Sequence, residues 1–195
     1  MNDSSQSVMS ISKLKRHFIA ILLTINFIFM GIAAIPESFS QDITDDEIKA
    51  ALVFKFPVYV RWPGGAMNAK IDYFEFRVMG NCRLSDLLSQ FDGENVMGKT
   101  IRVKRLSNIE ALGNCHMLFI SSSEKSNLPA IFKAIKGKPI LTVGDMKGFA
   151  RNGGIINFIL KKDSVHFEID PESGKRAGLK ISSKLLRLAK IVKDK

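Results

Sequence analysis

The sequence predicts an α/β class domain: a single three-layer domain with a mixed, mostly parallel sheet and a C-terminal antiparallel hairpin followed by a helix. Between residues 43 and 143, short apolar runs of strand length alternate with segments whose apolar residues recur at helical spacing. Strands that alternate with helices are typical of a parallel sheet covered on both faces. Near the end of the chain, two apolar runs flank a tight polar turn, and a stripe of leucines follows them.

The first element is a helix expected over residues 43–62. Thr44 can cap it, and the acidic residues 45–47 lie where the helix dipole favours negative charge. Pro57 lacks an amide proton and clashes with the preceding turn, so the helix should kink or end near Phe56. Trp62 begins a Trp-Pro-Gly-Gly loop and is expected to be a packing anchor.

The middle of the chain contains strands and short helices in alternation. We expect a strand at 74–79, a helix at 84–91, strands at 100–105 and 117–120, a polar loop at 121–126, a helix at 128–135 and a strand at 139–143. A turn at 144–148 then leads into a short helix near Phe149.

Residues 153–169 predict the hairpin. Gly153 and Gly154 supply backbone freedom before the run 155–160, and residues 165–169 alternate with period two. In that alternation Glu168 and Asp170 are expected on an exposed face. Pro171 and Gly174 should end the strand pattern.

The last predicted element is an amphipathic helix from Ser182 onward, with an apolar stripe formed by Leu185, Leu188, Ala189 and Val192. Its other faces carry the candidate partner-binding residues Lys184, Arg187, Lys190 and Lys193. A basic helix face that merely keeps the protein soluble is the alternative.

The first forty residues predict export. A basic start at Lys13–Arg16 precedes an apolar run from Phe18 to Ile32, and small residues precede Gln41, as in a secretory signal peptide cleaved after Ser40. An uncleaved anchor is the alternative, although the run is shorter than the roughly 20 apolar residues that span a bilayer. We therefore expect a signal peptide at 1–40 and one exported domain at 41–195.

Composition restricts the partners of the exported chain. Residues 1–40 contain three of the 29 basic and two of the 19 acidic residues, so the remainder has a formal charge of +9. No nucleic-acid-binding motif is present, and an exported protein seldom meets nucleic acid. Acidic protein surfaces, anionic head groups or cell-wall polymers are better candidates for a basic domain.

The chain has two cysteines, Cys82 and Cys115. An even pair in an oxidising compartment favours a disulfide, if neighbouring strands bring the two ends together. Two buried thiols are the alternative.

No catalytic, cofactor or metal motif is present, and the sequence predicts a protein that is not an enzyme. The serines Ser121, Ser122 and Ser123 follow one strand and Asp145 follows another, where α/β folds often bind ligands. Those four residues are candidate ligand-binding residues of a periplasmic small-ligand sensor, the alternative function. Local hydrogen bonding in loop and turn is the simpler interpretation.

Several segments, in order, resemble the YfiR-like family of periplasmic regulatory proteins. They are 49–63, 78–80, 115–120, 140–145, 153–155, 167–169 and 177–189, so that the likeness covers about residues 48–191. Pro57, Arg61 and Asp170 depart from the residues usual in that family.

The resemblance implies a small periplasmic α/β protein that restrains a membrane-bound signalling enzyme of the diguanylate cyclase type through protein–protein contact. It further implies an outer-membrane lipoprotein as a second partner, and a homodimer.

Overall fold

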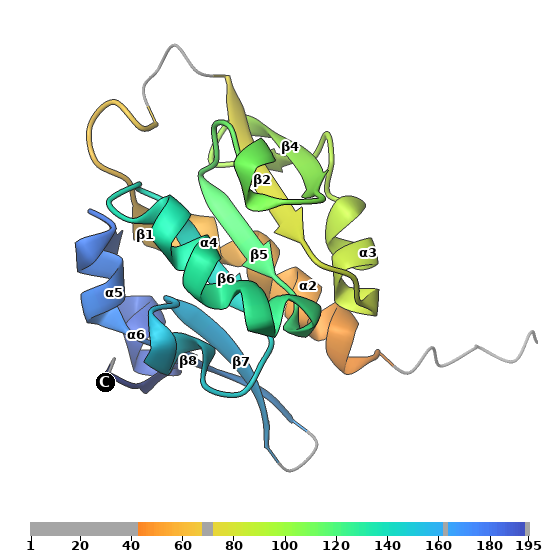
Figure 1. Ribbon diagram of the computed structural model, residues 1–195, viewed down its shortest axis with the longest axis vertical. Coiled ribbons are helices and arrows are strands. Elements are labelled where there is room, and N and C mark those ends of the chain that lie inside the picture. The colour runs from red at the N-terminus through yellow and green to blue at the C-terminus, as the bar shows by residue number, and fades with distance from the viewer. Residues whose placement is uncertain (1–42, 68–71, 162–163, 194–195) are drawn as a thin grey trace, which may run out of the picture. The chain divides into compact units, whose positions relative to one another are not determined.

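The computed structural model describes residues 43–67, 72–161 and 164–193 of the chain. The predicted signal peptide lies outside these residues. The described chain forms an eight-stranded sheet in the order β10-β8-β7-β6-β5-β2-β4-β3, and a separate pair, β1-β9 (Figure 1). The strands are β1 Val60–Arg61, β2 Tyr73–Met79, β3 Asn95–Val96, β4 Lys99–Leu106, β5 Met117–Ile120, β6 Leu141–Gly144, β7 Ile156–Lys161, β8 Ser164–Ile169, β9 Lys180–Ile181 and β10 Lys190–Ile191.

The centre of the large sheet is parallel. Strands β4, β2, β5, β6 and β7 all run the same way, whereas β8 returns antiparallel to β7 as the predicted hairpin. The edge strands are very short: β3 pairs antiparallel with β4, and β10 pairs parallel with β8. The predicted mixed, mostly parallel sheet is therefore confirmed.

Helices cover both faces of this sheet, and the strands divide their side chains between two apolar cores. On β5, Met117 and Phe119 belong to one core, while Leu118 and Ile120 belong to the other. The first core is completed by α2 (Asp45–Lys55) and α3 (Arg83–Ser89), and the second by α4 (Leu128–Ile135). In Figure 1 α4 lies in front of the sheet and α2 behind it. This is the three-layer arrangement expected of alternating strands and helices.

Helix α2 begins as predicted. Thr44 caps it in a capping box, because its hydroxyl accepts from the amide of Glu47 and the Glu47 carboxylate accepts from the amide of Thr44. Pro57 ends the α-helix at Lys55, and the chain continues as the 3-10 helix η1 (Phe56–Tyr59). The buried ring of Phe56 then packs against Phe158 and Phe167, with ring centroids 5.9 and 5.3 Å away.

Three short 3-10 helices, η2 Ile109–Ala111, η3 Ser122–Asn127 and η4 Phe149–Asn152, connect the larger elements. Residues 121–126 were expected to form a polar loop, so η3 corrects that prediction. Ser121 begins η3 as its N-cap, since its hydroxyl accepts from the amide of Ser123. Short 3-10 segments next to α-helices are common connectors.

The end of the chain differs most from the prediction. Residues 171–176 form a helix, α5 (Pro171–Arg176), where only a break was expected. The final helix, α6 (Ser183–Leu188), is capped by Ser182, where the helix was expected to begin, but it ends at Leu188. Ala189 is extended, with φ −97° and ψ 152°, and the chain pairs with β8 as β10 instead of continuing the helix. The otherwise unpaired edge of β8 accounts for this, because exposed strand edges favour added pairing.

Candidate functional site

The four predicted partner-binding cations lie at the end of the chain, on three consecutive segments. Lys184 and Arg187 belong to α6, Lys190 belongs to β10, and Lys193 follows that strand. The expectation that all four share one helix is therefore wrong, although all four are exposed. None of them forms any of the side-chain ion pairs found within the described residues.

Apolar side chains are interspersed with these cations. Leu188 at the end of α6 is 72% exposed and Ile191 in β10 is 49% exposed, whereas Leu185 and Val192 point into the protein and are buried. We call the six exposed residues of this region the basic edge: Lys184, Arg187, Leu188, Lys190, Ile191 and Lys193.

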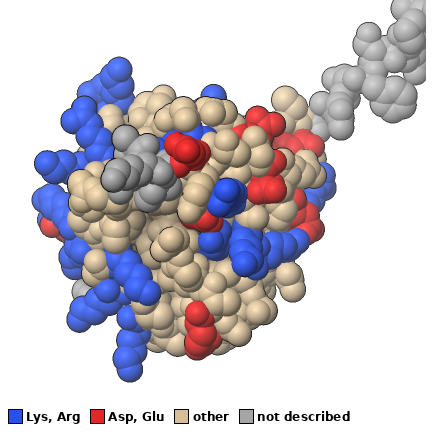
Figure 2. Space-filling model, turned by 90° about the horizontal axis from the view of Figure 1, so that it is seen from above, with Lys and Arg blue, Asp and Glu red and all other residues tan. Residues whose placement is uncertain are grey.

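Figure 2 places this region in a wider distribution of charge. Lysine and arginine side chains gather along the left-hand side of the molecule, the side on which α5 and α6 lie in Figure 1. Unpaired charges at a protein surface attract oppositely charged partners over roughly a Debye length, about 8 Å at physiological ionic strength. The basic edge thus combines long-range attraction with apolar contacts that can be buried on binding.

Two of the three predicted ligand-binding serines, Ser121 and Ser123, form hydrogen bonds with Asn81, which follows β2. Ser121 is buried, and its hydroxyl lies 3.2 Å from that of Ser123 and donates to the carbonyl of Asn81. The Ser123 hydroxyl accepts from the amide of Asn81 at 3.0 Å, while Ser122 is exposed on η3. Gly80 allows this close approach, because a Cβ there would lie 2.4 Å from the Ser123 oxygen. The serines join the ends of β2 and β5.

Asp145, the fourth candidate, forms an ion pair with a residue that sequence reasoning did not select. Lys49 on α2 is buried, and its Nζ lies 2.8 Å from an oxygen of Asp145 and 3.4 Å from one of Asp46. Burial lowers the pKa of Lys49, but the hydrogen bond and charge of Asp145 and of Asp46 outweigh it, so the pKa is raised. The contact ties α2 to the turn after β6. The position of Lys49 beside the apolar residues Ala50 and Val53 of the helix was the sequence feature that could have indicated this ion pair.

Cys82 and Cys115 are both free thiols, so the predicted disulfide is not formed. The prediction assumed that the end of one strand lies near the start of its neighbour. Because β2 and β5 run parallel, with Phe76 opposite Met117, Cys82 follows the carboxyl end of β2 and Cys115 precedes the amino end of β5. A disulfide requires a Cα separation of roughly 4.4–6.8 Å, which two cysteines at opposite edges of a sheet cannot reach. Burial raises the pKa of the Cys115 thiol to about 12, which leaves it unreactive at neutral pH.

A buried polar cluster surrounds the start of β5. His116 accepts the amide proton of Glu75 at Nδ1 and lies 2.8 Å from the Ala66 carbonyl through Nε2, which makes it a neutral imidazole protonated at Nε2. Backbone groups thus satisfy both ring nitrogens of His116. On the same strand as Glu75, Arg77 forms a buried ion pair with the Glu75 carboxylate and donates to the carbonyl of Leu112. Sequence reasoning missed this pair.

Trp62 completes the packing around His116. Its indole is half-buried, lies edge-on to Phe74 with ring centroids 5.6 Å apart, and donates from Nε1 to the His116 carbonyl. These contacts support a packing role for Trp62.

The predicted exposed carboxylates on β8 are buried, which corrects that prediction. Glu168 accepts a hydrogen bond from the amide group of Asn157, and Asp170 caps α5. In the sheet Glu168 stands between Asn157 of β7 and Lys190 of β10. Within the described residues, no group of three or more histidine, cysteine, aspartate or glutamate side chains could hold a metal ion. Nor does any helix among them reach the length and apolarity needed to cross a membrane.

Comparison with known proteins identifies the family. The YfiR/HmsC-like family matches residues 46–190, and no curated protein matches the chain. Among solved structures, the L-Trp-bound ABC domain from Streptococcus pneumonia is similar over 65% of this chain and 58% of that one, with 9% identity and a TM-score of 0.47. That likeness is too remote to bear on function. The family match spans nearly all of the described domain, and the chain belongs to the YfiR/HmsC-like family of periplasmic proteins, which regulate cyclic-di-GMP signalling and are regulatory rather than catalytic.

Proposed function

We propose that this protein restrains a membrane-bound signalling enzyme of the diguanylate cyclase type by direct contact in the periplasm. The family supports the signalling system, and the basic edge is the observation that supports binding to a protein. Its four cations form no ion pair within the described residues, and its two exposed apolar side chains, Leu188 and Ile191, lie among them. An acidic partner surface with an apolar centre matches this arrangement.

The proposed mechanism is occupancy. The partner's periplasmic region binds the basic edge, and its signalling output rises when the regulator leaves. An outer-membrane lipoprotein that binds the same protein would provide the release step. Neither step requires a chemical reaction by this chain.

Deletion of the gene tests the regulatory role. We expect cellular cyclic-di-GMP to rise, and the wild-type gene supplied in trans to reverse the rise. In the same cells, crosslinking followed by pull-down from the envelope should recover an inner-membrane signalling protein. Unchanged cyclic-di-GMP after deletion would argue against the proposed function.

Charge reversal tests the surface. The variant Lys184→Glu, Arg187→Glu, Lys190→Glu and Lys193→Glu should lower the association rate with the purified partner region more than it raises the dissociation rate, since exposed charges act mainly before contact. The control reverses four other exposed lysines, Lys104, Lys125, Lys133 and Lys147, and so changes the net charge equally. If both variants slow association equally, the net charge and not the basic edge is responsible.

A further inference from the structure

A cavity of about 430 Å³ opens between α4 and α5, beside the amino end of β6. It shares no residue with the basic edge or with the serine loop. Its lining comes from α4 and the loop after it, from the sheet layer at Ile140, Thr142 and Ile155, and from α5 with Ala177. Its size lies within the range of small-molecule sites, roughly 300–1,000 Å³.

The inner part of the cavity is apolar. Ile140 and Ile155 are both buried parts of the sheet layer, and Ile135 and Phe132 contribute the α4 wall. Thr142 is the one hydroxyl in this part, and its oxygen already accepts from the amide of Ile155 at 2.9 Å. A ligand that fills this part must therefore present a hydrocarbon or aromatic body.

The mouth of the cavity is cationic. Lys136, Lys138 and Arg176 line it, and no aspartate or glutamate is among the lining residues. Lys136 and Lys138 are exposed and form none of the side-chain ion pairs found within the described residues. Arg176 is held in place by the Ser173 hydroxyl at 2.6 Å and by Asp170 at 3.6 Å. The charge at the mouth favours an anion.

We propose that this cavity binds a small amphipathic carboxylate, with its apolar body between α4 and α5 and its acid group at Lys136 and Lys138. A neutral molecule of the same shape would bury the same apolar area without the two cations. An inorganic anion would meet the cations and leave the apolar interior unfilled. The proposal is independent of the proposed regulatory function.

Octanoate is the probe, and 1-octanol is its uncharged counterpart. Titration of the protein, with isoleucine methyl groups labelled for NMR, should shift the methyl signals of Ile135, Ile140 and Ile155 on addition of octanoate. Octanol should bind about fivefold more weakly, since one or two partly exposed charge contacts contribute about 1 kcal/mol. Equal binding of the two compounds, or no shift at these three methyl groups, would overturn the proposal.

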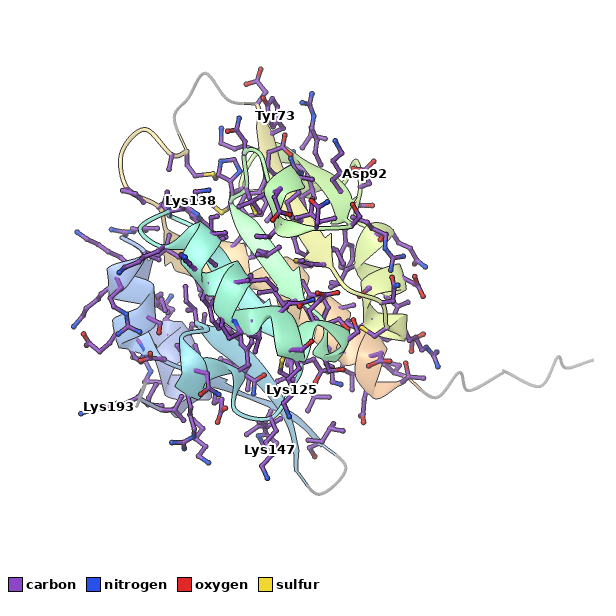
Figure 3. The ribbon with its side chains drawn as sticks, in the orientation of Figure 1. Tyr73, Asp92, Lys125, Lys138, Lys147 and Lys193 are labelled. Atoms are coloured by element: carbon purple, nitrogen blue, oxygen red, sulfur yellow. The ribbon has the colours of Figure 1, made fainter. Side chains whose placement is uncertain are left out.

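The lysines are tested by a matched pair of double variants. Lys136→Ser with Lys138→Ser should weaken octanoate binding by about fivefold or more and leave octanol binding unchanged. The control, Lys125→Ser with Lys147→Ser, removes two exposed lysines that do not line the cavity. Figure 3 shows these two at the opposite end of the domain from Lys138. If the control pair weakens octanoate binding as much as the first pair, overall charge explains the effect and the site is wrong.

A filled cavity supplies a second test. Ala177 is half-buried and lines the cavity, so Ala177→Leu should reduce the binding of octanoate and octanol alike, provided that thermal melting shows a folded variant. Flotation of the protein with phosphatidylglycerol vesicles distinguishes a free acid from a membrane lipid as the ligand. If the protein floats with the vesicles and the Lys136 and Lys138 variant does not, the ligand is a membrane lipid and not a free acid. That result would overturn the proposal.

Discussion

Phe149 shows why the adjacent glycines 153 and 154 have different roles. Only Gly153 has a positive φ, 105°, so it supplies the backbone freedom that the sequence predicted for both. Gly154 is needed for space: a Cβ at this position would lie 2.2 Å from the buried ring of Phe149. Gly144 is needed for the same reason, because a Cβ there would lie 2.5 Å from the Phe149 ring. The ring is packed directly against two stretches of backbone.

Gly154→Ala should therefore destabilise the domain by about 1–3 kcal/mol, the usual cost of an overpacked core, because neither the ring nor the backbone can move away. Denaturant unfolding of the purified domain measures the change. Gly64→Ala is the matched control, since a Cβ there would meet no atom within 4 Å and its φ is not positive. Equal stability of the two variants would contradict this packing.

His116 predicts a pH dependence of folding. Burial, the largest effect, lowers its pKa below the ordinary value; Glu75 acts in the opposite direction and Lys99 and Arg77 act in the same direction. A group whose pKa is lower in the folded protein stabilises fully above its unfolded pKa, about 6.5. Stability should then decrease as the pH falls through the folded value, when protonation of Nδ1 removes the acceptor of the Glu75 amide.

Urea unfolding between pH 7 and pH 5 measures this dependence. His116→Gln should flatten the profile, because glutamine does not titrate. His166→Gln is the control, the same substitution at a histidine that is exposed on β8. If the unfolding free energy of His116→Gln depends on pH as steeply as that of the wild type, a group other than His116 causes the dependence.

At the scale of single elements, α5 depends on its first residue. Asp170 is buried and accepts from the amides of Glu172 and Ser173, while Pro171 supplies the fixed φ of the first helical position. The order Asp-Pro-Glu is a helix-start signal that is visible in the sequence. Sequence reasoning treated Pro171 and Gly174 as breakers, because a six-residue helix has no apolar period to detect.

Asp170→Ala should cost about 2 kcal/mol, near the upper end for an N-cap, since the cap is buried and its donors would lose their acceptor. Thermal or chemical unfolding gives the value. Glu172→Ala is the comparison: its exposed pair with Lys175 should contribute only about 0.2–0.5 kcal/mol. A loss at Asp170 no larger than that at Glu172 would exclude the capping role.

Elements with a clear period were predictable, and elements defined by pairing were not. The strand 74–79, the helix 128–135 and the hairpin follow apolar patterns and appear where expected. The two-residue strands β1, β3, β9 and β10 have no period: β3 and β10 pair with the free edges of β4 and β8, and β1 and β9 pair with each other. That is why the last helix was predicted too long, and why Lys190 and Lys193 were assigned to it.

At the scale of the whole molecule, strand direction determines which distant residues meet. The alternation of strands and helices predicted the parallel sheet, but strand order is not visible in the apolar pattern. The candidate residues that follow β5 and β6, Ser121–Ser123 and Asp145, do lie at one edge of the sheet, as expected of parallel strands. The hydroxyls of Ser121 and Ser123 are occupied by Asn81 and the carboxylate of Asp145 by Lys49, which no local pattern could have indicated.

Export remains a prediction. We expect the mature protein to begin at Gln41, because a basic segment, an apolar run and small residues precede that position. Mass spectrometry of the protein from the periplasmic fraction measures its N-terminus. Recovery of a chain that begins at Met1 in the membrane fraction would indicate an anchor instead.

The two thiols test the topology of the sheet. If β2 and β5 are parallel, Cys82 and Cys115 lie at opposite edges and no bond can form within one chain, even in an oxidising compartment. Alkylation of the periplasmic protein under denaturing, non-reducing conditions should then label both cysteines, and added reductant should not change the melting temperature. The single variants Cys82→Ser and Cys115→Ser should each accept one label, which shows that the reagent reaches both sites. An unlabelled monomer would require the two ends to be close together, and so would contradict the parallel pairing of β2 with β5 on which the three-layer arrangement depends.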